Sequence, residues 1–197
     1  CPEPEEKPMT ASPAPQRRTL ILLFALFGLP LAMSFFLYYA TGWRPQGNSN
    51  HGELISPVIP LEDASTALDA ASPLKGKWSL LVVGEGACAE DCRRALVFAR
   101  QTRLSLNKEM DRVNRVFLAT DGDFDQAWLD SEHPGLKVID AEAGNAALLA
   151  RIPTQDREHS VFVVDPLGNL MMRYDSREDP KGLLADMKKL LRLSHIG

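Results

Sequence analysis

The stretch that decides the fold is residues 78–93, WSLLVVGEGACAEDCR, in which an apolar run passes through two glycines into a pair of cysteines. Residues 78–83 are almost all apolar, which is typical of a strand buried on both faces at the centre of a sheet. Gly84 and Gly86 end this strand. Residues 89–107 then repeat apolar side chains at helical spacing. The stretch therefore predicts a buried strand, a loop that carries cysteine, and a helix.

Downstream of this stretch the pattern keeps alternating between strands and helices. The predicted elements are strands at residues 113–119, 161–164 and 170–174, and helices at residues 124–131, 143–150 and 180–191. Asp179 and Pro180 are favoured residues for the start of the last helix. The order strand, helix, strand, helices, hairpin and helix predicts an α/β fold in which helices flank a central mixed sheet. It is also the order of the thioredoxin fold, so we expect a thioredoxin-like domain.

Residues 20–40 form an uncharged apolar run of 21 residues, LILLFALFGLPLAMSFFLYYA. As a helix with a rise of ~1.5 Å per residue the run is ~32 Å long, enough to cross the ~30 Å hydrocarbon core of a bilayer. A cleaved signal peptide is the alternative, but its apolar run is shorter and ends in small residues, whereas this one ends near Tyr38 and Tyr39. We therefore predict one transmembrane helix at residues 19–41, N-terminal to the thioredoxin-like domain.

The charges beside the apolar run predict its orientation. Arg17 and Arg18 precede the run, and only Arg44 follows it closely. Because positive residues favour the cytoplasmic side, the N-terminus is expected in the cytoplasm and the C-terminal domain outside it. The expected organisation is a Pro-rich disordered segment at 1–18, the membrane helix at 19–41, a linker at 42–57 and the domain at 58–197.

Composition is that of an ordinary globular protein, with 45% hydrophobic residues, 24% charged residues and a net charge of −4. The absence of a basic run excludes nucleic acid as an expected partner. Of the three cysteines, Cys88 and Cys92 form an isolated close pair, which indicates a redox or metal pair rather than a disulfide framework. Met9 is the expected start of the natural protein, with residues 1–8 upstream of it. A lipidated Cys1 is the alternative.

Cys88 and Cys92 follow the first core strand, at the predicted start of a helix. Backbone N–H groups at a helix N-terminus stabilise a thiolate, which is both the nucleophile and the metal ligand. Soft sulfur suits Cu(I), and an added nitrogen ligand accommodates Cu(II) or Zn(II). His159, just before the strand at 161–164, can supply that nitrogen. The rival interpretations are a structural disulfide and an ordinary surface histidine. The remaining histidines are interpreted as surface residues: His51, His133 and His195.

At these residues the chain resembles the Sco (SenC) family of copper-binding assembly factors for cytochrome c oxidase. Residues 74–78 (LKGKW) are similar to the lead into that family's first core strand, and Cys88-x-x-x-Cys92 matches its metal-binding pair. His159-Ser160, an apolar strand and the turn from Asp165 match its histidine segment. The single N-terminal membrane anchor also matches. The chain departs from the usual C-P-x-x-C-P pattern, because Ala89 and Arg93 stand where that family has proline.

The resemblance implies copper, as Cu(I) or Cu(II), bound by Cys88, Cys92 and His159. It also implies a metallochaperone that acts on cytochrome c oxidase subunit II or another component of a respiratory complex, either delivering copper to the oxidase or reducing its copper site. The implied location is the bacterial inner membrane, with a single span and the C-terminal domain in the periplasm. Two alternatives stay open: a metal-free thiol–disulfide oxidoreductase, in which the two cysteines are the catalytic pair, and a non-catalytic thioredoxin-like scaffold.

Overall fold

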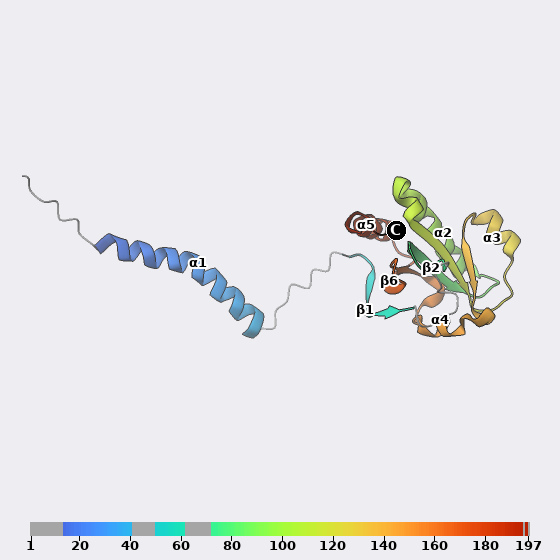
Figure 1. The fold of residues 1–197 in the computed structure, drawn as a ribbon, viewed down its shortest axis with the longest axis horizontal. Coiled ribbons are helices and arrows are strands. Elements are labelled where there is room, and N and C mark those ends of the chain that lie inside the picture. Colours follow the sequence, from blue (N-terminus) through green and yellow to red (C-terminus); the bar gives the residue numbers. More distant parts are fainter. Residues whose placement is uncertain (1–13, 41–49, 62–71, 195, 197) are drawn as a thin grey trace, which may run out of the picture. The chain divides into compact units, whose positions relative to one another are not determined.

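The computed structural model describes residues 14–40, 50–61, 72–194 and 196, and it divides into two units between Asn48 and Ser49. The first unit contains the helix α1 (Ala14–Ala40), drawn in blue in Figure 1. Within its residues 17–40, an 18-residue window has a mean hydropathy of 2.5, and none of that window is buried inside the protein. Among the described residues, α1 is the one helix long and apolar enough to cross a membrane, which supports membrane anchoring.

The helix α1 begins earlier than the sequence predicted. Residues 14–18 were expected to be disordered, but they are helical. Helix propagation is easier than helix initiation, and Ala, Gln and Arg are good helix formers. The apolar run therefore extends its helix into this segment. The rest of the predicted disordered segment, residue 41 of the predicted span and residues 42–49 of the predicted linker lie outside the described residues.

The second unit is built on a six-stranded sheet with the order β1-β6-β5-β2-β3-β4. The strands are β1 (Glu53–Pro60), β2 (Trp78–Gly84), β3 (Val113–Ala119), β4 (Lys137–Asp140), β5 (Ser160–Val164) and β6 (Asn169–Asp175). β2, β3 and β4 run parallel to one another, and the pairs β2–β5, β5–β6 and β1–β6 are antiparallel. The sheet is therefore mixed, as predicted. Its central strands β2 and β5 are buried along their whole length.

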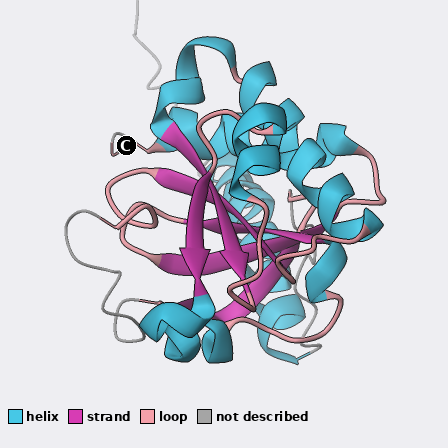
Figure 2. Ribbon diagram, turned by 90° about the vertical axis from the view of Figure 1, so that its right-hand side faces the viewer, coloured by secondary structure: helices cyan, strands magenta, loops and turns pink. Residues whose placement is uncertain are grey.

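Helices cover both faces of this sheet, as Figure 2 shows. They are α2 (Glu90–Ser105), α3 (Gln126–Glu132), α4 (Ala146–Arg151) and α5 (Pro180–Leu193), with the short turns η3 (Asn107–Arg112), η4 (Ala141–Asn145) and η5 (Arg157–His159). Side chains that alternate along the strands divide into two cores. One core contains Phe98 of α2 and Met187 of α5, and the other contains Leu148 of α4. The predicted α/β class with flanking helices is confirmed.

Two strands, β1 and β4, are not predicted from the sequence. β1 covers residues 53–60, so residues 53–57 of the predicted linker are strand and the fold begins before residue 58. Most of β1 is exposed and it contains two prolines, so it lacks the apolar alternation that identifies a half-buried strand. β4 has four residues, of which one is buried, and a segment that short carries no clear period.

A buried carboxylate holds the chain just before β1 against the domain. Asp186 of α5 is 5% exposed. Its oxygens accept hydrogen bonds from the backbone N–H of His51 at 2.7 Å, that of Gly52 at 3.3 Å and the Tyr174 hydroxyl at 2.8 Å, and His51 Nδ1 lies 3.1 Å away. Burial raises the pKa of Asp186, but these bonds, those from His51 foremost, outweigh burial and leave the pKa below its ordinary value. We call these four residues the Asp186 cluster.

Candidate functional site

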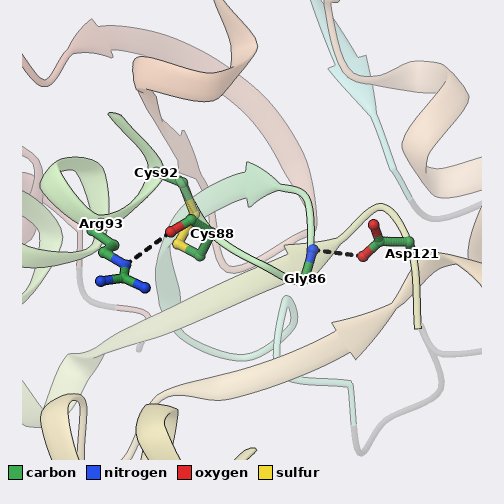
Figure 3. Close-up of a disulfide and its surroundings, with 5 residues drawn as sticks. All are labelled: Gly86, Cys88, Cys92, Arg93 and Asp121. Carbon is green, nitrogen blue, oxygen red and sulfur yellow. Dashed lines mark hydrogen bonds between the residues drawn. A yellow bond between two sulfur atoms is a disulfide. The ribbon is translucent and has the colours of Figure 1, made fainter. Parts of the chain in front are cut away.

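The two cysteines of the predicted pair are joined to each other. Cys88 and Cys92 form a disulfide between the end of β2 and the first turn of α2, and both residues are buried (Figure 3). A thiolate is the form of cysteine that binds a metal or attacks a disulfide, so this oxidised pair has to gain two electrons before either reaction. The structure thus brings the predicted pair together in its oxidised form.

Cys88 lies in the loop between β2 and α2, one residue before the N-cap of the helix. The backbone N–H of Cys88 donates to the carbonyl of Glu85 at 2.9 Å, and Cys88 itself has a φ of +42°. Positive φ is uncommon for residues other than glycine, so the loop needs further contacts to hold this shape. Ala89 is the N-cap of α2 but provides no side-chain cap.

Contacts on both sides supply that support (Figure 3). On one side, Arg93 Nε donates to the carbonyl oxygen of Cys88 at 2.9 Å, and the Arg93 guanidinium lies 4.9 Å from the centre of the Trp128 ring. On the other side, the backbone N–H of Gly86 donates to Asp121 Oδ1 at 2.5 Å. The loop is therefore attached to α3 through Arg93 and to the end of β3 through Asp121. In the sequence alone, Arg93 stands out only as a departure from the family's proline.

The two glycines of this segment are required by close packing. A Cβ built on Gly84 would lie 2.9 Å from Cys92 Sγ, and one built on Gly86 would overlap the backbone of Asp123. Atoms in folded proteins do not approach a Cβ this closely, so a larger residue at either position would displace the loop. The glycines first identified as strand breakers thus let the disulfide lie against the end of β2.

His159 lies at the end of η5, beside the first turn of α2, and its side chain is 18% exposed. Its Nε2 is 3.3 Å from Asp156 Oδ1, and its Nδ1 is 3.7 Å from Asp91 Oδ2. Nδ1 is buried and has no hydrogen-bond partner. Because Asp91 immediately precedes Cys92, the structure brings the histidine segment next to the cysteine segment, as predicted from chain order.

The three predicted ligands are not assembled around one point in this oxidised form. Within the part of the chain that the structure describes, no three His, Cys, Asp or Glu side chains are arranged to hold one metal ion. At the cysteines the reason is chemical, since each sulfur is bonded to the other. After reduction the donor set would be two thiolates and an imidazole whose Nδ1 is already free of hydrogen bonds, which is a set that fits Cu(I).

Two adjacent hollows border this site and share Gly84, Glu85 and Glu158. The larger, about 450 Å³, is lined by His159 and Asp156 among others. The smaller, about 180 Å³, is lined by Cys92, Glu90 and Asp91 among others. Four carboxylates line the smaller hollow, and Arg94 lies within ion-pair distance of two of them, Glu90 and Asp91.

Comparison with known proteins agrees with this architecture. No curated protein sequence matches the chain. Among solved structures, yeast Sco1 with copper bound is 16% identical with a TM-score of 0.54, over 61% of this chain and 82% of that one. A second structure of yeast Sco1 is 16% identical with a TM-score of 0.51, over 61% and 87%. ScoI of Bradyrhizobium japonicum with copper bound is 23% identical with a TM-score of 0.49, over 59% and 86%. The predicted resemblance to Sco proteins is confirmed at the level of the fold.

One family model also matches the sequence. It is described as the transmembrane-like, thioredoxin-like, C-terminal domain, and it covers residues 78–194. That range contains every element from β2 to α5 together with the disulfide and His159. The chain therefore belongs to the transmembrane-like, thioredoxin-like family.

Proposed function

We propose that this protein is a membrane-anchored, Sco-like assembly factor that binds copper and acts on the copper site of cytochrome c oxidase subunit II. Cys88, Cys92 and His159 are the proposed ligands. The observation that carries the proposal is the placement of His159, whose unbonded Nδ1 lies 3.7 Å from the carboxylate of Asp91, directly before Cys92. The fold shared with copper-bound yeast Sco1 supports it.

The chemistry begins with the disulfide. Two electrons and two protons convert it into the thiols of Cys88 and Cys92, and loss of the protons gives two soft thiolate donors for Cu(I). His159 would supply the third donor, because its Nδ1 is not engaged by a hydrogen bond. Copper is then the cargo, and its transfer is an exchange of these ligands for those of the client. Alternatively, the two thiols reduce a client disulfide and return to the disulfide seen here.

The proposed location is the bacterial inner membrane, with α1 in the bilayer, the N-terminus in the cytoplasm and the second unit in the periplasm. The length and hydropathy of α1 support the anchor. Arg17 and Arg18 before the apolar run support the orientation. An exported, oxidising compartment also agrees with the disulfide between Cys88 and Cys92.

The test is a Cu(I) titration of the full chain in detergent after reduction, with a coloured Cu(I) chelator as competitor. We expect about one tightly bound Cu(I) per reduced chain, because two thiolates and one imidazole complete a single site. His159→Ala should weaken binding at least ~10-fold, because loss of even a residue that only supports a ligand costs that much at metal sites. The unreduced protein is the matched control and should not compete with the chelator. Binding by the reduced protein that is no tighter than that of a Cys88→Ser, Cys92→Ser variant would reject copper coordination.

A metal-free thiol–disulfide oxidoreductase is the second candidate, favoured by the disulfide itself. This function predicts reversible exchange between Cys88–Cys92 and a partner disulfide, with little effect of His159→Ala. Turnover of a model disulfide by the wild type and by His159→Ala distinguishes it from copper delivery. Equal turnover without copper affinity favours the oxidoreductase.

A further inference from the structure

Arg93 connects the disulfide to the rest of the domain in a way that the proposed ligand set does not require. It directly follows Cys92 on α2, and its backbone N–H makes the ordinary helical bond to Ala89 at 3.0 Å. Its side chain turns back, and Nε donates to the carbonyl oxygen of Cys88 at 2.9 Å (Figure 3). The guanidinium lies over the Trp128 ring of α3 at 4.9 Å. One side chain thus joins both cysteine positions to a second helix.

The neighbouring arginine shows that these contacts are specific to Arg93. Arg94 also lies in the first turns of α2, but its guanidinium is directed to the carboxylates of Glu90 at 3.0 Å and Asp91 at 4.0 Å. No contact of Arg94 with the cysteine loop is among the hydrogen bonds of the described residues. The two arginines carry the same charge close to the disulfide and differ in whether they contact the Cys88 backbone.

We propose that Arg93 is a positioning residue that keeps Cys88 beside Cys92 after the disulfide opens, and so sets how strongly the pair favours the disulfide. The inference rests on the proposed function only in requiring that the pair be reduced and reoxidised. A thiol reductant such as glutathione supplies two electrons that break the S–S bond, and each sulfur takes up one proton while the reductant becomes a disulfide. Reoxidation by a disulfide reverses this. With the bond open, the loop keeps its shape only through noncovalent contacts such as the one from Arg93 to Cys88.

Holding two reacting groups close together raises their effective concentration and favours the bond between them. Arg93 therefore stabilises the disulfide form relative to the dithiol. A positive charge near a thiolate has the opposite effect, because it stabilises the reduced form. The first effect dominates here because the guanidinium is directed at the backbone carbonyl of Cys88 and stacked on Trp128. A planar guanidinium provides both contacts at once, and a lysine ammonium does not.

The test is equilibration of the full chain in detergent with reduced and oxidised glutathione, followed by alkylation and a mass measurement of the disulfide fraction. Arg93→Met should make the disulfide about 10-fold easier to reduce, a rise of about 30 mV in reduction potential. Arg93→Lys keeps the charge but should behave like Arg93→Met. Trp128→Leu removes the stacking surface and should shift the equilibrium the same way, by about 3-fold. Arg94→Met, the matched control, should stay within about 2-fold of the wild type.

Several outcomes would overturn the inference. One is a thiol–disulfide equilibrium of Arg93→Met that lies within 2-fold of the wild type, or that shifts toward a more stable disulfide. Another is a wild-type equilibrium in Arg93→Lys, which would assign the effect to charge. If Arg93→Met fails to fold, as judged by thermal melting, Trp128→Leu decides the result alone. A disulfide that resists excess dithiothreitol contradicts the inference and the proposed function together. An intact Arg93 effect without Cu(I) binding contradicts the copper proposal alone.

Discussion

The Asp186 cluster and the His159 site, which consists of His159, Asp91 and Asp156, each join segments that are distant in sequence. The two regions are nevertheless built differently. At Asp186 a buried carboxylate is held by His51, Gly52 and Tyr174 at 2.7–3.3 Å. At His159 the carboxylates are half-exposed, the contacts are 3.3 and 3.7 Å long, and Nδ1 has no hydrogen bond. A fully bonded buried charge fixes the structure around it, whereas loosely paired charges leave a side chain able to change partners. The Asp186 cluster therefore holds its segments in one arrangement, whereas His159 is able to exchange its partners for a ligand.

Removing the buried carboxylate of Asp186 should have the largest effect on stability, and it tests whether the two regions differ. Asp186→Ala should lower the free energy of unfolding by about 3–5 kcal/mol, because the buried Tyr174 hydroxyl and the partly buried donors of His51 and Gly52 lose their acceptor. Chemical denaturation measures the change. Asp91→Ala is the control and should cost less than about 0.5 kcal/mol, since its ion pair is half-exposed. Equal losses for the two variants would remove the distinction between the regions.

A change next to the disulfide tests how tightly the second region is packed. Gly84→Ala would place a Cβ 2.9 Å from Cys92 Sγ, so we expect a loss of about 1–3 kcal/mol from overpacking. Gly122→Ala is the matched control, because its Cβ would meet only the Asp140 and Glu142 carboxylates, at 3.4 and 3.5 Å. Denaturation of both oxidised variants measures the difference. A Gly84→Ala protein as stable as Gly122→Ala would show that the loop yields freely.

His133 shares with His159 a buried Nδ1 that lacks a hydrogen-bond partner, but it lies deeper in the domain. It is 2% exposed, so its interpretation as a surface residue is wrong. Burial lowers its pKa, and the charges of Arg115 and Arg100 lower it further. The unfolded chain therefore binds this proton at a higher pH than the folded one. Stability should fall as pH drops below the ordinary value of about 6.5, until the lowered folded pKa is reached, by up to about 1.4 kcal/mol per pH unit.

The measurement for this smallest effect is the midpoint of urea unfolding between pH 7.5 and pH 5. His133→Gln should flatten the dependence over that range, because the variant side chain does not titrate. Asp175 does not imitate the effect, since its pairing with Arg177 lowers its pKa to about 2, well below this window. An unchanged slope in His133→Gln would place the responsible group elsewhere.

The sequence predicted what depends on local pattern. The apolar run of β2, its glycine break and the cysteines at the start of α2 follow from composition and spacing, and all three are confirmed. The position of His159 near α2 follows from chain order in a thioredoxin-like fold. The contacts of Arg93 and the burial of His133 depend on residues that are distant in sequence. Such long-range contacts leave no periodic signal in a sequence, so they could not be predicted.

β1 has a consequence for handling the protein in shortened form. It covers the outer side of β6, and its Pro57 and Pro60, together with the break in register between Leu54 and Ile59, make it a poor template for another strand. A fragment trimmed at residue 58 would lose most of this protective strip and uncover the N–H and C=O groups of β6. Such a fragment would aggregate in solution through the exposed edge of β6. Turbidity would then result from the missing strand and not from a defect at Cys88, Cys92 or His159.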